Sequence, residues 1–373
     1  MAETRSMKLA DRVLEFDSSG IRKVFDLAQQ LENPINLSIG QPDFDVPVAL
    51  KAEAKRWLDA GFNKYTVTQG IPELRDLVRA KYEAQGIAVG DVIITSGVSG
   101  GIMLALLALL NPGDEALVPD PYFVMYKHLT NLIGGVARFV DTYPDFVLTA
   151  EAVEAAVTPQ TRLLFVNTPA NPTGVTLDEA GARAIAAVAE RHDLVIVFDE
   201  IYEYFHYDSA PVNIARFWPK TLILNGLSKS HGMTGWRLGW AVGPAEIIRE
   251  MIKVQQYSFV CAPSFAQKAA VKALEAPPLA KAREAYRRKR DLAYRRLGER
   301  FRVVRPQGAF YLFPEAPYGD AEAFTQLAVR NNVLIVPGKV FSERNTHFRV
   351  SFAVSDDILL QGIKILNEIA RAG

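Results

Sequence analysis

Residues Leu194 to Glu200 read Leu-Val-Ile-Val-Phe-Asp-Glu, in which five apolar residues run directly into two carboxylates. A short, continuous apolar run of this kind is typical of a strand that is buried on both faces. Such strands belong to parallel sheets, and ligands bind beyond the carboxyl ends of parallel strands. The stretch therefore predicts a carboxylate, Asp199, at the ligand-binding edge of a sheet. Taken alone, Asp199 has the simpler interpretation of a residue that caps the next helix.

Six further runs of the same kind lie on either side of this stretch, at residues 92–95, 116–118, 136–140, 163–167, 221–225 and 238–242. Helical patterns separate the runs, and this alternation predicts βαβ units in a mainly parallel sheet covered by helices on both faces. We therefore expect a three-layer α/β domain with a seven-stranded sheet over residues 46–279.

The pattern changes after the charged helical stretch at residues 279–300. Residues 301–304, 310–313, 333–336 and 348–352 resemble short strands, and residues 356–372 predict a closing helix. We expect a smaller α+β domain formed by residues 280–373 together with residues 1–45, which include an amphipathic segment at 21–31. A chain of 373 residues is longer than one hydrophobic core usually serves, which agrees with two domains.

The composition excludes several classes of function. Lys plus Arg and Asp plus Glu both number 42, so the formal net charge of zero argues against binding to nucleic acid or to an anionic membrane. The single cysteine, Cys261, favours a reducing, cytoplasmic compartment. Residues 1–17 lack the apolar core of a signal peptide. The longest apolar run, residues 102–110, is too short to span a bilayer and predicts a buried helix.

A lysine follows the apolar run at 221–225, in the small-residue turn Gly-Leu-Ser-Lys-Ser at residues 226–230. Most lysines lie in water. A lysine that is partly desolvated and close to other cations loses its proton more easily and acts as an amine nucleophile, which is the interpretation we favour for Lys229. Arg237 follows closely and offers a two-pronged guanidinium for a phosphate. The alternative for Arg237 is a surface arginine beside a buried tryptophan.

Residues 96–101 read Ser-Gly-Val-Ser-Gly-Gly and connect the strand at 92–95 to the apolar helix from residue 102. A small-residue turn that opens a helix exposes backbone N–H groups at the positive end of the helix dipole, which favours phosphate. The same residues also match G-x-S-x-G, the nucleophile elbow of serine hydrolases, with Ser99 as the nucleophile.

The hydrolase alternative requires Asp199 and one of three histidines, His206, His231 or His347, as partners of Ser99. This alternative gives no role to four polar residues, which are Lys229, Arg237, Asn171 and Arg349. The sequence also contains no oxyanion loop of the HGGG type.

A loop with the sequence Asn-Thr-Pro-Ala-Asn-Pro-Thr-Gly follows the strand at 163–167 and occupies residues 167–174. Its two prolines favour an extended, rigid backbone that presents Asn171 to a ligand, although a plain connection between strand and helix is the simpler interpretation. The five histidines and the one cysteine form no HxxH or CxxC group, so no metal site is predicted.

Taken in order, these four groups of residues resemble the class I and II aminotransferases of pyridoxal-phosphate fold type I, over nearly the whole chain from Asn36 to the C-terminal helix. The resemblance implies pyridoxal 5′-phosphate as the cofactor, held as a Schiff base. It also implies transfer of an amino group from an L-amino acid to a 2-oxo acid such as 2-oxoglutarate. The family further implies a homodimer with shared active sites.

The resemblance implies a role for twelve residues. Lys229, Asp199 and Tyr202 would be catalytic, with Lys229 forming the Schiff base and moving a proton, and Asp199 pairing with the pyridine nitrogen. Tyr202 and Asn171 would form hydrogen bonds to the ring oxygen, and Phe123 would stack on the ring. The phosphate would be bound by Val98, Ser99, Ser228 and Arg237, and Tyr65 would contact the phosphate of the neighbouring subunit. The substrate would be bound by Arg349, Gly40 and Asn171.

The chain departs from the family pattern at Gly226, where many members carry serine, and at Phe123, where many aspartate enzymes carry tryptophan. The phosphate turn holds no cation that would grip an acidic substrate side chain. The segments at residues 19–23 and 226–229 resemble members that act on aromatic amino acids. An aromatic or broad donor range is therefore favoured, with aspartate as a further candidate. Relatives with the same lysine and aspartate also catalyse β-elimination at C–S bonds, which is the main alternative.

Overall fold

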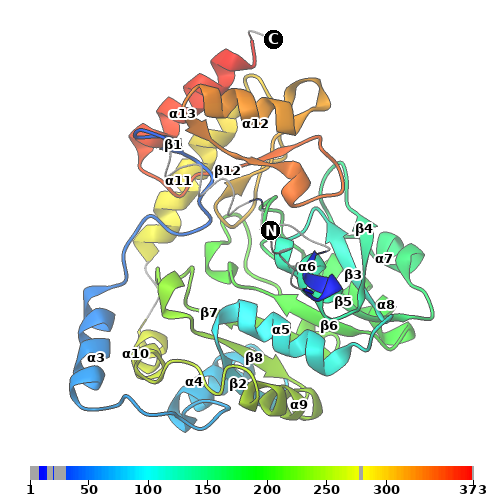
Figure 1. Ribbon diagram of the computed structural model, residues 1–373, viewed down its shortest axis with the longest axis vertical. Helices are drawn as coiled ribbons and strands as arrows, with labels where there is room; N and C mark the ends of the chain where they lie inside the picture. Colours follow the sequence, from blue (N-terminus) through cyan, green and yellow to red (C-terminus); the bar gives the residue numbers. More distant parts are fainter. Residues whose placement is uncertain (1–7, 15–19, 21–30, 277–279, 372–373) are drawn as a thin grey trace, which may run out of the picture.

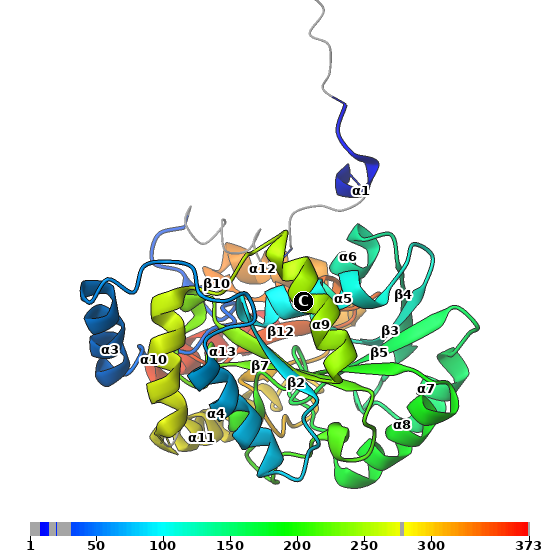
Figure 2. The same ribbon diagram turned by 90° about the horizontal axis from the view of Figure 1, so that it is seen from below.

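The computed structural model describes residues 8–14, 20, 31–276 and 280–371 (Figures 1 and 2). The predicted amphipathic segment at 21–31 and the segment at 19–23 lie outside the described residues, apart from Gly20 and Leu31. The first described helix is α1 (Asp11–Leu14). Within the described ranges, no helix combines the length and the apolar character needed to cross a membrane.

All seven predicted strands of the large sheet are present, each within two residues of its expected bounds. The strand order is β2-β8-β7-β6-β5-β3-β4. Strand β8 runs in the direction opposite to that of the other six strands. The prediction of a mainly parallel α/β sheet is therefore confirmed. The strands are β2 (Asp91–Thr95), β3 (Glu115–Asp120), β4 (Val136–Asp141), β5 (Thr161–Asn167), β6 (Val195–Asp199), β7 (Thr221–Gly226) and β8 (Gly239–Gly243).

The direction of winding reverses between β3 and β5. After β3 the chain adds β4 on the outer side, whereas β5, β6 and β7 follow one another on the opposite side of β3. Ligands in open α/β sheets bind where the strand order reverses, outside the carboxyl ends of the strands. The topology therefore places the candidate site beyond the ends of β3, β5, β6 and β7.

Successive side chains of β6 alternate between the two faces of the sheet, as the pleat requires. Ile196 and Phe198 join one hydrophobic cluster, and Val197 joins another on the opposite face. The first face is covered by α3 (Val48–Asp59), α4 (Pro72–Glu83), α7 (Ala150–Ala156), α8 (Glu179–Arg191) and α10 (Ser264–Glu275), and the second by α5 (Gly97–Leu109), α6 (Val124–Leu132) and α9 (Ala245–Gln256).

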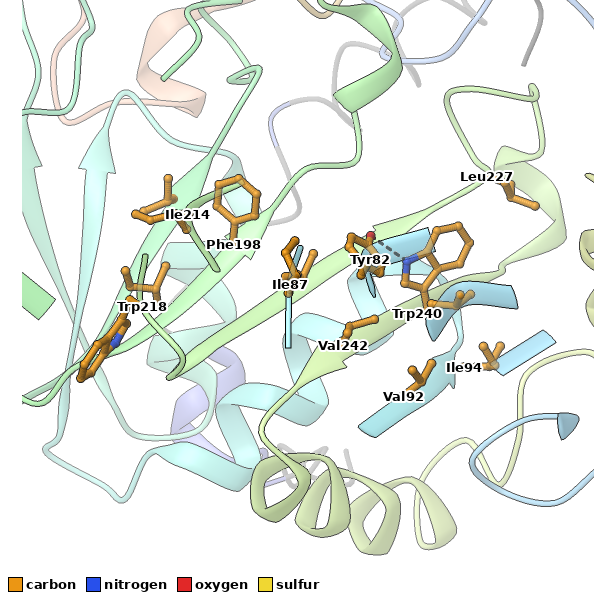
Figure 3. Close-up of a cluster of buried hydrophobic side chains, with 14 of the residues drawn as sticks. Tyr82, Ile87, Val92, Ile94, Phe198, Ile214, Trp218, Leu227, Trp240 and Val242 are labelled. Carbon is orange, nitrogen blue, oxygen red and sulfur yellow. Dashed lines mark hydrogen bonds between the residues drawn. The ribbon is translucent and has the colours of Figure 1, made fainter. Parts of the chain in front are cut away.

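Figure 3 shows part of the cluster on the first face, where Tyr82 of α4 meets Trp240 of β8. The indole Nε1 of Trp240 donates a hydrogen bond of 3.1 Å to the hydroxyl of Tyr82. Both side chains are almost completely buried, and buried Tyr and Trp side chains usually require such a polar partner.

A separate hydrophobic cluster is built by α11 (Ala280–Leu297), α12 (Ala321–Arg330) and α13 (Asp356–Ile369), which lie together at the top of Figure 1. Two small sheets complete it. β1 (Ile35–Asn36) pairs in parallel with β10 (Val333–Leu334), and β11 (Val336–Pro337), β12 (Phe348–Ser351) and β9 (Tyr311–Leu312) form an antiparallel sheet in that order. The segment at Ile35–Asn36 therefore pairs with Val333–Leu334, close to the last three helices of the described chain.

Two strand predictions in this region were wrong. Residues 301–304 form no strand, because Phe301 packs into the cluster without a partner strand, and the backbone of Arg302 accepts a single hydrogen bond, of 2.9 Å, from Glu315. The predicted strand at 333–336 is two strands, β10 and β11, which pair with different partners on either side of Ile335.

Candidate active site

A pocket of about 340 Å³ lies beyond the carboxyl ends of the central strands. It is lined by eleven of the twelve residues predicted from the sequence, which are Gly40, Val98, Ser99, Phe123, Asn171, Asp199, Tyr202, Ser228, Lys229, Arg237 and Arg349. The exception is Tyr65, which does not line the pocket and is 84% exposed. Residues far apart in the sequence thus meet at one site, whose volume suits a small-molecule ligand.

Asp199 ends β6 and points to the face covered by α6, because its side chain lies on the same side of the strand as Val197. Its Oδ2 accepts a hydrogen bond of 2.7 Å from the hydroxyl of Tyr126 on α6, and its Oδ1 accepts one of 3.1 Å from the backbone N–H of Ile201. Burial raises the pKa of Asp199 to about 6, against the hydrogen bonds from Tyr126 and Ile201 and the charge of Lys229, which lower it. The pocket therefore contains a carboxylate that would be stabilised by a cationic partner.

Glu200, the second carboxylate of the opening stretch, points to the opposite face. Its Oε1 accepts hydrogen bonds of 2.7 Å from Tyr82 and 3.0 Å from Asn225, and its Oε2 accepts one of 3.0 Å from Asn213. Burial, followed by the charge of Glu203, raises the pKa of Glu200 to about 8. Glu200 therefore belongs to a polar network inside the core, and Asp199 alone of the two lines the pocket.

Lys229 is part of the turn that follows β7, and its Nζ donates a hydrogen bond of 2.6 Å to the backbone oxygen of Gly40. Burial, together with the charges of Arg349 and Arg237, lowers the pKa of Lys229 to about 8, and the charge of Asp199 opposes them. At pH 7 about one tenth of the amine is therefore unprotonated, far more than for a lysine in water, and the unprotonated amine is the nucleophile.

The residues predicted as a turn before the apolar helix are themselves helical, because α5 begins at Gly97 rather than at residue 102. Val98 and Ser99 thus lie in the first turn of a 13-residue helix, where backbone N–H groups have no partner inside the helix. Gly97 has a positive φ of 67°, and a Cβ there would lie 2.5 Å from NH2 of Arg237. The guanidinium of Arg237 is therefore packed against this helix start, and among the described carboxylates it has no ion-pair partner.

Gly226 lies opposite Gly239 in the pairing of β7 with β8. Many members of the family that the sequence resembles carry serine at this position. A Cβ at residue 226 would lie 2.8 Å from the backbone oxygen of Leu238 and 2.9 Å from Cα of Gly239. Real Cβ contacts are essentially never that short, so a serine at residue 226 would require these two strands to move apart.

Arg349 is 1% exposed on β12 and forms no ion pair with any described carboxylate. Its NH1 donates a hydrogen bond of 2.9 Å to Oδ1 of Asn171, and its NH2 donates one of 2.8 Å to the backbone oxygen of Ser38. Its Nε is buried without a partner in the described structure. Because a buried, unpaired charge is costly, the arrangement favours an anionic ligand at this guanidinium.

The hydrolase alternative is wrong for this site. None of the three candidate histidines lines the described pocket with Ser99. Nδ1 of His231 lies 2.9 Å from the hydroxyl of Ser230, Nδ1 of His347 lies 2.9 Å from the hydroxyl of Thr346, and Nδ1 of His206 is buried without a described partner.

Sequence reasoning did not identify two tyrosines of the site. Tyr126 contacts Asp199 directly, and its place three residues after Phe123 on the same side of α6 was a signal available in the sequence. Tyr311 lines the pocket from β9, and its hydroxyl lies 2.8 Å from that of Tyr202. The other lining residues that were not predicted are Ser38, Ile39, Gln41, Asn167, Ile201 and Thr234.

Comparison with known proteins gives the same answer as the geometry. The family described as aminotransferase class I and II matches residues 32–365. The probable aspartate aminotransferase of Methanocaldococcus jannaschii is 36% identical over 97% of this chain and 99% of its own length. Aromatic-amino-acid aminotransferase 2 of Thermococcus litoralis is 36% identical over 98% and 99% of the two chains. The structure of aspartate aminotransferase from Thermus thermophilus with maleate superposes with a TM-score of 0.92, at 35% identity over 99% of this chain and 100% of that one.

One pocket brings together a partly buried lysine, a buried carboxylate and two arginines that form no ion pair with a described carboxylate, and these groups define an enzyme site for anionic small molecules. The chain belongs to the class I and II aminotransferase family. It is a pyridoxal-phosphate-dependent aminotransferase, which moves an amino group between amino and oxo acids.

Proposed function

We propose that the described pocket binds pyridoxal 5′-phosphate and that the enzyme transfers amino groups from L-amino acids to a 2-oxo acid such as 2-oxoglutarate. Aromatic donors or a broad donor range are favoured, and aspartate is a further candidate. The observation that carries the proposal is that Lys229 and Arg349 line the same pocket. One pocket holds a buried amine with a lowered pKa and a buried guanidinium whose Nε has no described partner.

The residues present fit this cofactor. The start of α5, with Val98 and Ser99, would bind the phosphate, with Arg237 and Ser228 assisting. The buried carboxylate of Asp199 would hold the protonated pyridine nitrogen. The other proposed contacts are the ring face on Phe123, the ring oxygen on Tyr202 and Asn171, and the aldehyde carbon on Lys229.

The cofactor, when bound, supplies an electron sink for the substrate Cα. Arg349 would hold the substrate carboxylate, supported by Gly40 and Asn171, and so fix the orientation of the Cα–H bond. Nζ of Lys229 would remove the Cα proton as a base and then, as an acid, deliver it to the aldehyde carbon of the cofactor. The negative charge of Asp199 would keep the proton on the pyridine nitrogen throughout.

The donor preference is supported by the lining of the pocket. The described lining contains three cations, Lys229, Arg237 and Arg349, and the proposal assigns each of them to the cofactor or to the substrate carboxylate. The lining residues that the proposal leaves unassigned carry no charge, and they are Ser38, Ile39, Gln41, Asn167, Ile201, Thr234 and Tyr311. An apolar or aromatic substrate side chain fits this lining better than an acidic one.

We also propose that residues 46–279 form a cofactor-binding domain, that residues 1–45 and 280–373 form a smaller one, and that two chains form a homodimer with shared sites. The separate hydrophobic cluster around α11, α12 and α13 supports the division. Tyr65, Val67 and Tyr257 are 84%, 54% and 93% exposed, and apolar side chains at the surface support a partner there. In that dimer Tyr65 would reach the phosphate in the partner subunit.

The test is an absorbance spectrum of the purified protein with pyridoxal phosphate, followed by addition of Tyr, Phe, Asp or Ala one at a time without an oxo acid. We expect a visible band that the preferred donors convert to the spectrum of the aminated cofactor, with release of an equal amount of oxo acid. Release of ammonia and pyruvate would instead identify a β-lyase. Absence of a cofactor band, or the same band and turnover in Lys229→Ala, would overturn the proposal.

A further inference from the structure

Tyr311 lies between the part of the pocket assigned to the substrate carboxylate and the part assigned to the cofactor ring. It is fully buried on β9, where it pairs with Ser351 of β12, two residues beyond Arg349. Side chains two residues apart on a strand point to the same face. Tyr311 and Arg349 are therefore diagonal neighbours across the strand pair, within reach of a long side chain and an aromatic ring.

The ring of Tyr311 contacts the guanidinium of Arg349. Cζ of Arg349 lies 4.5 Å from the centroid of Tyr311 and 4.5 Å from the centroid of Phe341, so two buried rings flank the charge. A cation is attracted to an aromatic face, and the attraction is larger where water is excluded. The two rings thus orient a guanidinium whose outer nitrogens are bound to Asn171 and Ser38.

The hydroxyl of Tyr311 has a different neighbour. It lies 2.8 Å from the hydroxyl of Tyr202, and the two rings meet edge to face with centroids 5.7 Å apart. Under the proposed function the hydroxyl of Tyr202 donates a hydrogen bond to the ring oxygen of the cofactor, which leaves Tyr311 as the donor in the hydrogen bond between the two tyrosines. A hydroxyl that accepts a hydrogen bond becomes a stronger donor in a chain of such bonds.

The backbone leaves room for this hydroxyl at Gly40. A Cβ at residue 40 would lie 2.9 Å from Oη of Tyr311 and 3.7 Å from NH2 of Arg349. A side chain at residue 40 would therefore force the Tyr311 hydroxyl away from its present position beside Tyr202. The glycine, the hydroxyl pair and the flanked guanidinium form one packed unit.

We propose that Tyr311 is a positioning residue with two separable effects. Its ring orients Arg349 for the substrate carboxylate, and its hydroxyl strengthens the hydrogen bond that Tyr202 donates to the ring oxygen of the cofactor. The inference rests on the proposed function and goes beyond it, because it links two contacts that the proposed function treats as independent.

Two measurements on the holoenzyme separate the two effects. The first is the pH midpoint at which the bound-cofactor absorbance band titrates. A hydrogen bond to the ring oxygen stabilises the form that has lost the proton on the nitrogen joining Lys229 to the cofactor, so weakening that bond raises the midpoint. The second is the Kd of 3-phenylpropanoate, a carboxylate without an amine, which reports on Arg349.

Tyr311→Phe keeps the ring and removes the hydroxyl. We expect its midpoint to rise by roughly 0.3 to 0.6 pH unit, as a partial loss of hydrogen-bond strength implies, with the Kd within about twofold of wild type. Phe341→Leu is the matched control, because it removes a ring from Arg349 without touching Tyr202. We expect its Kd to rise about tenfold with an unchanged midpoint, and Tyr311→Leu to show both changes.

The decisive comparison uses Tyr202→Phe as the background. If Tyr311 acts through Tyr202, adding Tyr311→Phe to Tyr202→Phe shifts the midpoint no further, whereas a general structural effect would add to it. A wild-type midpoint in Tyr311→Phe, or an equal shift in both backgrounds, would overturn the inference while leaving the proposed function intact. Failure of the wild-type protein to form a cofactor band would instead remove the proposed function itself. If Tyr311→Leu does not fold, the Tyr-to-Phe variants still decide the question.

Discussion

The hydroxyl of Tyr126 donates a hydrogen bond of 2.7 Å to Oδ2 of Asp199, from a position where both side chains are buried. This bond lowers the pKa of a carboxyl group that burial raises, so it favours the charged form. It also fixes the carboxylate in place, because the Tyr126 ring is stacked on Phe165 with centroids 4.5 Å apart. Tyr126 thus supports the charge on which the proposed role of Asp199 depends.

Removal of this hydroxyl in Tyr126→Phe is expected to lower kcat/KM about tenfold, because a hydrogen bond to a charged group contributes about 1.5 kcal/mol. Steady-state kinetics with the preferred donor checks this. Tyr122→Phe is the control, since the Tyr122 hydroxyl donates to Glu343 at 2.7 Å and Tyr122 does not line the described pocket. Equal losses in the two variants would contradict a specific effect on Asp199.

The two adjacent carboxylates should differ sharply when each is neutralised. We expect Asp199→Ala to lose a factor of roughly 1000 or more in kcat, because the cofactor nitrogen loses its counter-charge. Glu200→Gln should stay within about tenfold, since Glu200 binds Tyr82 and Asn225 on the other face of the sheet. The comparison is made at saturating cofactor, and similar losses in both variants would remove the distinction.

The lowered pKa of Lys229 predicts a pH dependence in the cofactor-free protein. Only the unprotonated amine reacts with acetic anhydride, so labelling of Lys229 should rise about tenfold per pH unit at low pH and level off above about pH 8. Peptide-resolved mass spectrometry measures the rate. Because the charge of Arg349 lowers the pKa, Arg349→Ala should move the midpoint to higher pH, and a shift to lower pH would refute the electrostatic explanation.

Restoring the serine found in many relatives should harm this chain. In Gly226→Ser the new Cβ meets the backbone oxygen of Leu238 at 2.8 Å, and overpacking of this kind costs about 1–3 kcal/mol. We expect a Tm several degrees lower in thermal unfolding. Gly235→Ser is the matched control, because a Cβ there meets nothing within 4 Å. A Gly226→Ser protein with wild-type Tm and tighter cofactor binding would show that the strands separate easily.

The large sheet was predictable because its strands are continuous apolar runs, which depend little on what surrounds them. The run at 194–198 appears in the structure as β6, displaced by one residue. The segment at 301–304, Phe-Arg-Val-Val, also contains strand-forming residues, but Phe301 packs into the cluster around α11, α12 and α13, and no described strand lies beside it. Composition alone does not separate those two causes.

The site was predictable where its residues follow strands and less so where contacts join distant segments. Lys229 and Asn171 each come soon after a predicted strand, so the sheet topology brings them together. The contact of Tyr311 with Tyr202 joins residues 109 positions apart, and it depends on the pairing of β9 with β12. No local pattern around Tyr311 specifies that pairing.

The surroundings of Arg349 also determine the shape of what it accepts. Rings flank the guanidinium, its two outer nitrogens already donate to Asn171 and Ser38, and Nε remains without a described partner. A flat, two-oxygen anion slides into such a slot and meets the guanidinium edge to edge. A tetrahedral phosphonate or sulfonate is thicker and would press against the ring of Tyr311, which lines the pocket beside this guanidinium. The enzyme should therefore discriminate between acid groups of equal charge by their thickness.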